Sequence, residues 1–198
     1  MGFFTKLFNF SISKSAIQPA YNNNSIIGEA RHTNNQNIIN NYKNSEMPLD
    51  ILAIAISYER EGAKYRKEAI NFYEKFLLNP VEIPILPNRY TENKKPVRMF
   101  SYWDIYSSLA TLYEKEYNFD DAIKYLKKLP KESNYKNPAD YTRVGDVLAK
   151  IDINKSVKYY EKLMTTATYK KFKRPIDIKY RDALEKQSKG YVYKPKKK

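Results

Sequence analysis

The stretch from Trp103 to Asn134 constrains the fold more than any other part of the chain. Apolar residues recur three and four positions apart on each side of a break at residues 117–120, which places them on one face of each of two helices. These residues are Tyr106, Leu109, Ala110, Tyr113, Ala122, Leu126 and Leu129. The small side chains of Ala110 and Ala122 let two such helices approach closely. The stretch therefore predicts a helical hairpin.

The hairpin pattern resembles the tetratricopeptide repeat, a helix–turn–helix unit of about 34 residues. Tyr141 follows Tyr106 by 35 residues, which is close to that repeat length. Degenerate copies are expected on both sides, the first starting at Pro48 and the third at Asn137. A last helix is expected to start at Pro175, to stop near the following glycine, and to close the array. The resemblance implies an all-α fold, a right-handed α-solenoid of helical hairpins.

The predicted domain organisation has a repeat domain over residues 47–189 between two tails. Residues 1–46 are rich in Asn, which favours turns, so we expect a flexible N-terminal segment. Residues 81–100 form a Pro-rich insertion that is too apolar for a solvated loop. We expect it to lie extended against the helices, either at the edge of the binding surface or as an insertion without a function. Residues 190–198 are predicted to form a basic C-terminal tail.

The N-terminal segment contains three short apolar groups. Two of them, Ile26-Ile27 and Ile38-Ile39, interrupt the Asn-rich run and are candidates for short docking segments. Phe3, Phe4, Leu7 and Phe8 share one face of a short helix. That face is expected to pack on the repeat domain or to lie loose, and attachment to a membrane surface is a less favoured alternative.

The chain offers little of the chemistry that enzymes and metal sites need. It has no Cys, its single His is His32 in the Asn-rich run, and its five Gly are scattered. No thiolate, His pair or Gly-rich phosphate loop is therefore present, and we expect a non-enzymatic chain with no metal or other cofactor. A carboxylate-only active site would require a pocket with paired acids, which no spacing predicts. No apolar run is long enough to span a bilayer, so we expect a cytoplasmic rather than an integral membrane protein.

The resemblance also implies where a partner binds. In the family, the first helix of each repeat lines a concave groove that holds a peptide of another protein. The groove candidates here are Leu49, Leu52, Ile56 and Arg60 in the first copy, Ser108, Thr111 and Lys115 in the second, and Arg143, Asp146 and Lys150 in the third. The same faces carry Ala53, Glu59, Asp104, Ser107, Glu114, Ala139 and Thr142. Only Arg143 matches the clamp that holds a C-terminal carboxylate in some family members. We therefore expect a scaffold or adaptor whose partner offers an aliphatic or aromatic anchor.

The C-terminal end carries most of the charge. Residues 165–198 hold twelve Lys and Arg against three acids, a net charge of +9 within a total of +14. This end predicts an alternative function, binding of nucleic acid, an acidic protein or an anionic surface. The predicted basic patch consists of Lys170, Lys171, Lys173, Arg174, Lys194 and Lys196, and the interleaved rings are Tyr169, Phe172, Tyr191 and Tyr193. A solvated tail that keeps the domain soluble is the simpler interpretation.

Overall fold

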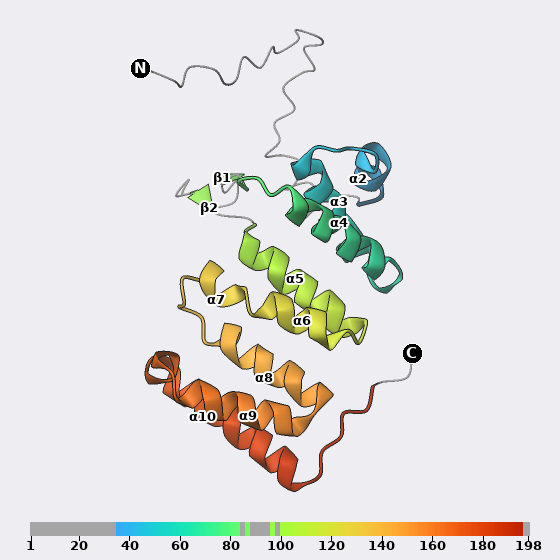
Figure 1. The fold of residues 1–198 in the computed structure, drawn as a ribbon. Helices are drawn as coiled ribbons and strands as arrows, with labels where there is room; N and C mark the ends of the chain where they lie inside the picture. Colours follow the sequence, from blue (N-terminus) through green and yellow to red (C-terminus); the bar gives the residue numbers. More distant parts are fainter. Residues whose placement is uncertain (1–34, 84–85, 88–95, 98–99, 196–198) are drawn as a thin grey trace, which may run out of the picture.

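The computed structural model describes residues 35–83, 86–87, 96–97 and 100–195, and this part of the chain is almost entirely helical (Figure 1). The helices are α2 (Asn35–Tyr42), α3 (Pro48–Glu61), α4 (Arg66–Leu78), α5 (Tyr102–Lys115), α6 (Phe119–Leu126), α7 (Leu129–Glu132), α8 (Ala139–Ile151), α9 (Ile153–Met164) and α10 (Ala167–Ser188), with a 3-10 turn η1 (Ala63–Tyr65). The strands β1 (Leu86–Pro87) and β2 (Pro96–Val97) form a short antiparallel pair. The all-α class is therefore confirmed.

Helices that follow one another in the chain pack together. The pairs α3 with α4, α5 with α6, and α8 with α9 are successive hairpins, and α10 packs on α9. Contacts of α4 with α5 and of α6 with α8 join each hairpin to the next. In Figure 1 the helices accordingly follow one another in chain order from α2 at the top to α10 at the bottom.

Small residues lie where the paired helices meet. Ala110 of α5 and Ala122 of α6 are both fully buried, as the hairpin prediction requires. Ala55 and Ala69 are buried in the same way in the first hairpin. In the third hairpin the Ser156 hydroxyl donates to the carbonyl oxygen of Gly145 at 2.8 Å, so α8 and α9 touch directly. The predicted hairpin at residues 103–134 is confirmed, with its break between Lys115 and Phe119.

Local hydrogen bonds and backbone geometry set both ends of α5. The Ser101 hydroxyl accepts from the Asp104 backbone N–H at the start of α5, so Ser101 is the predicted cap. After α5 ends, Tyr117 adopts a left-handed conformation with φ of 61°. The backbone N–H of Asn118 then donates to the carbonyl of Tyr113 at 2.9 Å, which reverses the chain into α6.

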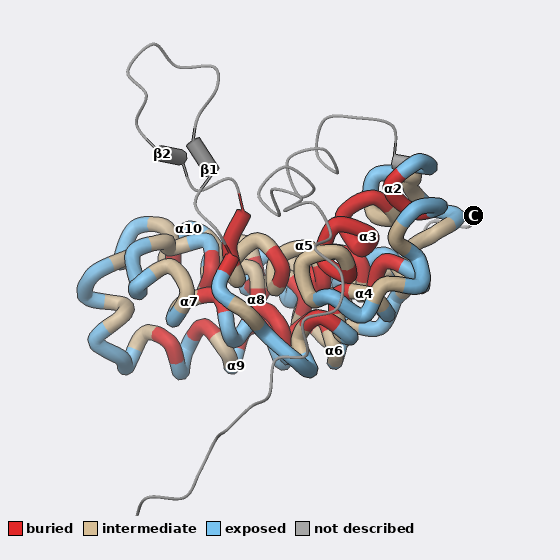
Figure 2. The backbone as a smooth tube through the Cα atoms, turned by 90° about the horizontal axis from the view of Figure 1, so that it is seen from above, coloured by how far each residue is buried: buried red, intermediate tan, exposed pale blue. Residues whose placement is uncertain are grey.

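The N-terminal segment is not flexible throughout, so that prediction was wrong for residues 35–42. They form α2, which packs on α3, and Ile38 and Ile39 are buried as the docking interpretation expects. Residues 51–57 of α3 are all buried, and Figure 2 shows this helix covered along most of its length. A helix that is apolar all round must be covered on every side, and α2 supplies one of those covers. Residues 1–34, with His32, the Phe3–Phe8 group and the Ile26-Ile27 pair, lie outside the described part.

Two further helix boundaries differ from the predictions. Leu129 belongs to the short helix α7 and does not end α6. The last helix starts at Ala167 instead of Pro175, which lies inside α10. Phe172 has non-helical angles of φ −123° and ψ 35°, so the helix kinks ahead of the proline ring. The predicted stop is confirmed, because Gly190 has a positive φ of 63° and the Tyr191 N–H donates back to the Lys186 carbonyl at 2.9 Å.

The two ends of the insertion pack against the helices. Ile83 and Phe100 are buried in the core that also contains α3, α4 and α5 residues. The Tyr102 hydroxyl donates to the carbonyl of Val81 at 2.8 Å and fixes the segment to the start of α5. The remainder of residues 81–100 lies outside the described residues. Among the helices that the structure describes, none is both long and apolar enough to cross a bilayer.

Candidate functional site

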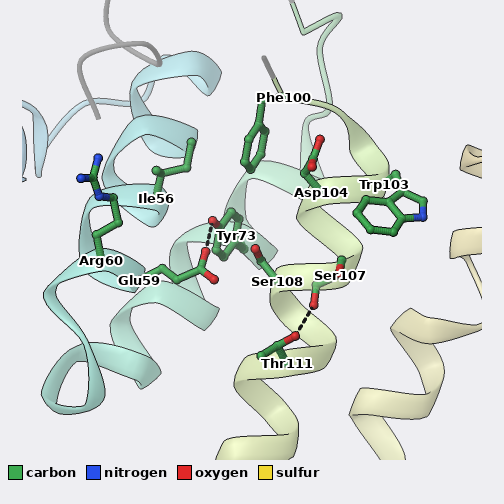
Figure 3. Close-up of a pocket in the computed structure, with 10 residues that line it drawn as sticks. All are labelled: Ile56, Glu59, Arg60, Tyr73, Phe100, Trp103, Asp104, Ser107, Ser108 and Thr111. Atoms are coloured by element: carbon green, nitrogen blue, oxygen red, sulfur yellow. Dashed lines mark hydrogen bonds between the residues drawn. The ribbon is translucent and has the colours of Figure 1, made fainter. Parts of the chain in front are cut away.

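A pocket of about 490 Å³ lies between α3 and α5, the first helices of the first two hairpins (Figure 3). Its lining consists of Ile56, Glu59, Arg60, Tyr73, Phe100, Trp103, Asp104, Ser107, Ser108 and Thr111. The α3 and α5 members among them all belong to the predicted groove faces, except Trp103. We call this space between α3 and α5 the open junction.

Helical spacing brings the polar side chains together. Ile56, Glu59 and Arg60 lie three and four positions apart on α3, and Asp104, Ser107, Ser108 and Thr111 repeat this spacing on α5. The side chains of Glu59 and Ser108 point toward Tyr73 at the centre of the pocket (Figure 3), whereas Arg60 turns outward. Each helix therefore presents one polar face to the pocket.

Hydroxyl groups hold the two pocket carboxylates. Tyr73 donates to Glu59 Oε2 at 2.6 Å, and Ser101 donates to Asp104 Oδ2 at 2.6 Å. Among the described residues neither carboxylate forms an ion pair, and neither Glu59 Oε1 nor Asp104 Oδ1 has a hydrogen-bond partner. The Ser108 hydroxyl also has no such partner within the described part of the chain. These groups are available to a ligand.

Three aromatic residues of the pocket were missed by the sequence-based prediction. Tyr73 was assigned to the core only, and it is fully buried there while its hydroxyl reaches Glu59. Phe100 ends the insertion, whose course no helical period predicts. Trp103 lies at the rim, where its indole N–H donates to Asp140 Oδ1 of α8 at 3.0 Å. Trp103 is the only tryptophan of the chain and lies at the start of a predicted helix, and this could have identified it as a candidate site residue.

Asp140 supports that rim from inside the protein. Its side chain is only 1 % exposed, and Oδ1 accepts from both Trp103 and Asn137 Nδ2. Asp140 Oδ2 is buried without a hydrogen-bond partner among the described residues. The start of α8, predicted as a capped first turn, is capped by Asn137 Oδ1, which accepts from the Ala139 N–H at 3.1 Å.

The predicted groove residues of α8 do not reach the pocket. Arg143 donates to Ser107 Oγ at 2.9 Å and to Thr111 Oγ1 at 3.1 Å, and Lys150 pairs with Glu114 at 2.8 Å. These bonds bridge α5 and α8, so we call this space the closed junction. Asp146 instead pairs with Lys179 of α10 at 2.8 Å.

Three other groove candidates also lie elsewhere. Leu52 is fully buried, which corrects its assignment as a partner contact, because α2 and the insertion complete the cover around α3. Leu49 is half-buried against the same core. Lys115 is exposed at the end of α5 and does not line the pocket. Of the ten predicted groove residues, the pocket contains Ile56, Arg60, Ser108 and Thr111.

The first two hairpins are joined beside the open junction by Glu74 of α4. Its Oε1 accepts from the Tyr113 hydroxyl at 2.7 Å and from the Tyr125 hydroxyl at 2.8 Å. Burial, followed by this hydrogen bond, raises the pKa of both tyrosines. The open junction is thus bounded by helices held through α4.

The predicted basic patch is divided by the structure. Lys170, Lys171, Lys173 and Arg174 are exposed near the start of α10, whereas Lys194 follows its other end and Lys196 lies outside the described residues. A 22-residue helix is about 30 Å long, so these groups do not form one surface. Of the interleaved rings, Tyr193 packs edge-on against Phe119, Phe172 against Tyr141, and Tyr169 donates to Asp177. Tyr191 is 36 % exposed.

Within the described part of the chain, no group of three or more His, Cys, Asp or Glu gathers where a metal ion could bind. Searches of protein-family models, curated proteins and solved structures found no match for this chain.

Proposed function

We propose that this chain is a non-enzymatic interaction module of the tetratricopeptide type. Residues 47–189 would form a right-handed solenoid of helical hairpins, and the open junction would hold a peptide of a partner protein. One observation carries the proposal: a pocket lies between the first helices of two neighbouring hairpins, on the faces that the repeat pattern assigns to a groove. A chain without Cys suits the reducing cytoplasm, where we place this module.

The size and lining of the pocket support peptide binding. Its volume of about 490 Å³ is that of a site for a small ligand or for one or two side chains. Buried aromatic and aliphatic walls provide an anchor site, and the hydroxyls and carboxylates around them can orient a peptide.

The pocket carboxylates favour binding over catalysis. Glu59 and Asp104 come from different helices, and each accepts a hydrogen bond from its own hydroxyl group, from Tyr73 and Ser101 respectively. No bond joins the two carboxylates to each other among the described contacts. Each carboxylate is therefore held by a hydroxyl group and keeps one oxygen for a ligand.

Selection of a displayed peptide library tests the proposal. The full chain should enrich peptides that the Ser108→Arg variant fails to retain, because the arginine fills the open junction. Ser108 is partly exposed on α5 and has no hydrogen-bond partner among the described residues, so this change should alter stability by less than about 0.5 kcal/mol.

The matched control is Asn71→Arg, which adds the same side chain at an exposed position of α4 outside the pocket lining. It should retain the enriched peptides. If Ser108→Arg retains them equally well, the pocket is not the binding site. If the unaltered chain enriches none, the peptide-binding proposal is wrong.

The second candidate is binding of nucleic acid or another anionic surface by the start of α10. The observation in its favour is the exposure of Lys170, Lys171, Lys173 and Arg174 within five residues. Lys171 also donates to the Tyr135 carbonyl at 2.6 Å, so it is best left intact in a test.

Fluorescence anisotropy with a labelled single-stranded RNA distinguishes this candidate. Affinity should fall steeply with salt, and the double variant Lys170→Gln, Lys173→Gln should weaken it. The control is Lys155→Gln, Lys158→Gln, which removes two exposed lysines at the same spacing on α9. Equal losses in both variants would indicate attraction by net charge alone.

A further inference from the structure

We propose that the open junction binds a cationic side chain, lysine or arginine, of the partner peptide. This inference rests on the proposed function and specifies the chemistry of the ligand. The expected partner had an aliphatic or aromatic anchor. The pocket instead combines apolar walls with carboxylates, and a long basic side chain matches both kinds of surface.

The acidic residues of this pocket differ from the neighbouring acidic residues in their ion pairing. Glu114 pairs with both Arg143 and Lys150, Glu116 with Arg66, and Asp146 with Lys179. Glu59 and Asp104, in contrast, form no ion pair with any described residue, although the whole chain carries a net charge of +14. Unpaired carboxylates that are partly withdrawn from water favour an incoming cation.

The acceptors available to that cation come from both helices. Glu59 Oε1 on α3 and Asp104 Oδ1 on α5 are unoccupied among the described contacts, because Tyr73 and Ser101 bond to the other oxygen of each carboxylate. The Ser108 hydroxyl points into the same space (Figure 3) and can accept a third hydrogen bond. A lysine ammonium has three donors and no acceptor, and a guanidinium has five donors, so either cation can bond to oxygens of this lining.

The walls suit the aliphatic part of such a side chain. Ile56, Tyr73 and Phe100 line the pocket beside the carboxylates, and Trp103 forms part of its rim. Basic side chains bury their methylene groups against apolar surface, and their charged ends are attracted to aromatic faces. Arg60 turns outward in Figure 3 and leaves the centre of the pocket accessible.

A second hollow of the protein shows a cation in a similar environment. Leu77, Val81, Tyr102 and Tyr106 line it, with a volume of about 430 Å³. Lys128 also lines this hollow, and its Nζ lies 4.8 Å from the centre of the Tyr106 ring. There the chain supplies its own cation, whereas in the open junction we assign that role to the partner.

Trp103 provides the readout, because it is the only tryptophan and lies at the pocket rim. The probes are capped nonapeptides of one alanine–serine sequence with lysine, arginine, Nε-acetyl-lysine, glutamate or phenylalanine at the centre. Titration of the full chain with the lysine and arginine peptides should change the Trp103 emission saturably. The acetyl-lysine and glutamate peptides should leave it unchanged.

Glu59→Gln and Asp104→Asn should each weaken binding of the lysine peptide about tenfold, since each removes one charged acceptor. The amide oxygens can still accept from Tyr73 and Ser101, so the pocket should keep its shape. Glu61→Gln removes a carboxylate from the same helix outside the pocket lining and should leave affinity unchanged.

Three outcomes contradict the inference in distinguishable ways. If the phenylalanine or glutamate peptide binds and the basic peptides do not, the cationic ligand is wrong but peptide binding stands. If acetyl-lysine binds as tightly as lysine, the charge has no role. If none of the five peptides changes the emission at millimolar concentration, both the ligand assignment and the proposed function are overturned.

Discussion

The two junctions on α5 are built from the same helix but have opposite character. Toward α3, hydroxyl groups and the Asp104 carboxylate of α5 line a pocket. Toward α8, Arg143 and Lys150 reach across to Ser107, Thr111 and Glu114 and fill the space. Side-chain length and charge pairing, not the helical face alone, therefore decide whether a junction is open or closed.

The largest expected effect comes from breaking the hairpin that supplies Arg143. A methyl group added at Gly145 would collide with the Tyr160 ring, so Gly145→Ala should destabilise the protein by about 3 kcal/mol. At an open helical position the same change stabilises by about 1 kcal/mol, so the sign alone is informative. Urea unfolding measures the effect.

Its control is the double variant Gly145→Ala, Tyr160→Leu. Removing the ring should make the combined loss smaller than the sum of the two single losses. Additive losses would show that α8 and α9 do not meet at this glycine.

The next largest effect comes from alkaline pH, which weakens the hydrogen bonds of Tyr113 and Tyr125 to Glu74 of α4 beside the open junction. The pKa of Tyr113 and of Tyr125 is raised from the ordinary 10.0, so in the unfolded chain these hydroxyls ionise at lower pH than in the folded protein. Their contribution to stability is therefore complete below pH 10 and decreases as the pH rises above it. Urea midpoints at pH 8 and pH 11 should show the loss.

The double variant Tyr113→Phe, Tyr125→Phe should lose less stability between these two pH values than the unaltered chain. An equal loss would assign the alkaline sensitivity to other groups, such as Tyr159 and Tyr160, whose pKa values burial also raises.

Opening the closed junction should have a moderate effect. Arg143→Ala removes bonds to Ser107 and Thr111 and an ion pair with Glu114, and its side chain is 29 % exposed. The expected loss is about 1–2 kcal/mol in the free energy of unfolding. Arg181→Ala is the control, since that exposed arginine bonds only to a carbonyl of its own helix among the described contacts. Similar losses in both variants would remove the distinction between the junctions.

The smallest effect is expected for Asp140 of α8, which accepts a hydrogen bond from Trp103 at the rim of the open junction. Asp140→Ala leaves the Trp103 indole N–H without its acceptor and should cost about 1 kcal/mol. It should also shift the Trp103 emission, whereas Asp140→Asn retains an acceptor oxygen and should shift it less. Identical spectra for the two variants would show that Asp140 does not position the pocket rim.

The hairpins could be predicted because their signal is local. Ala110, Ala122 and Gly145 mark the places where two helices touch, and helical spacing identifies the faces around them. The polar lining of the open junction followed from the same spacing, as Glu59, Asp104 and Ser108 show.

What could not be predicted depends on contacts between distant segments. The Asn-rich composition hid α2, although Ile38 packs in the same core as α3 residues and Ile39 is buried. Phe100 reaches the pocket through an insertion that has no helical period. Arg143 and Lys150 have the right spacing for a groove, but their bonds to α5 depend on how close α8 lies to it.

The cover that α2 provides has a practical consequence for trimming this protein. The repeat pattern begins at Met47, and a shortened chain starting there would lack Ile38 and Ile39. It would expose to water the apolar residues of α3 that α2 covers, and exposed apolar surface promotes aggregation. A soluble fragment should therefore begin before Asn35.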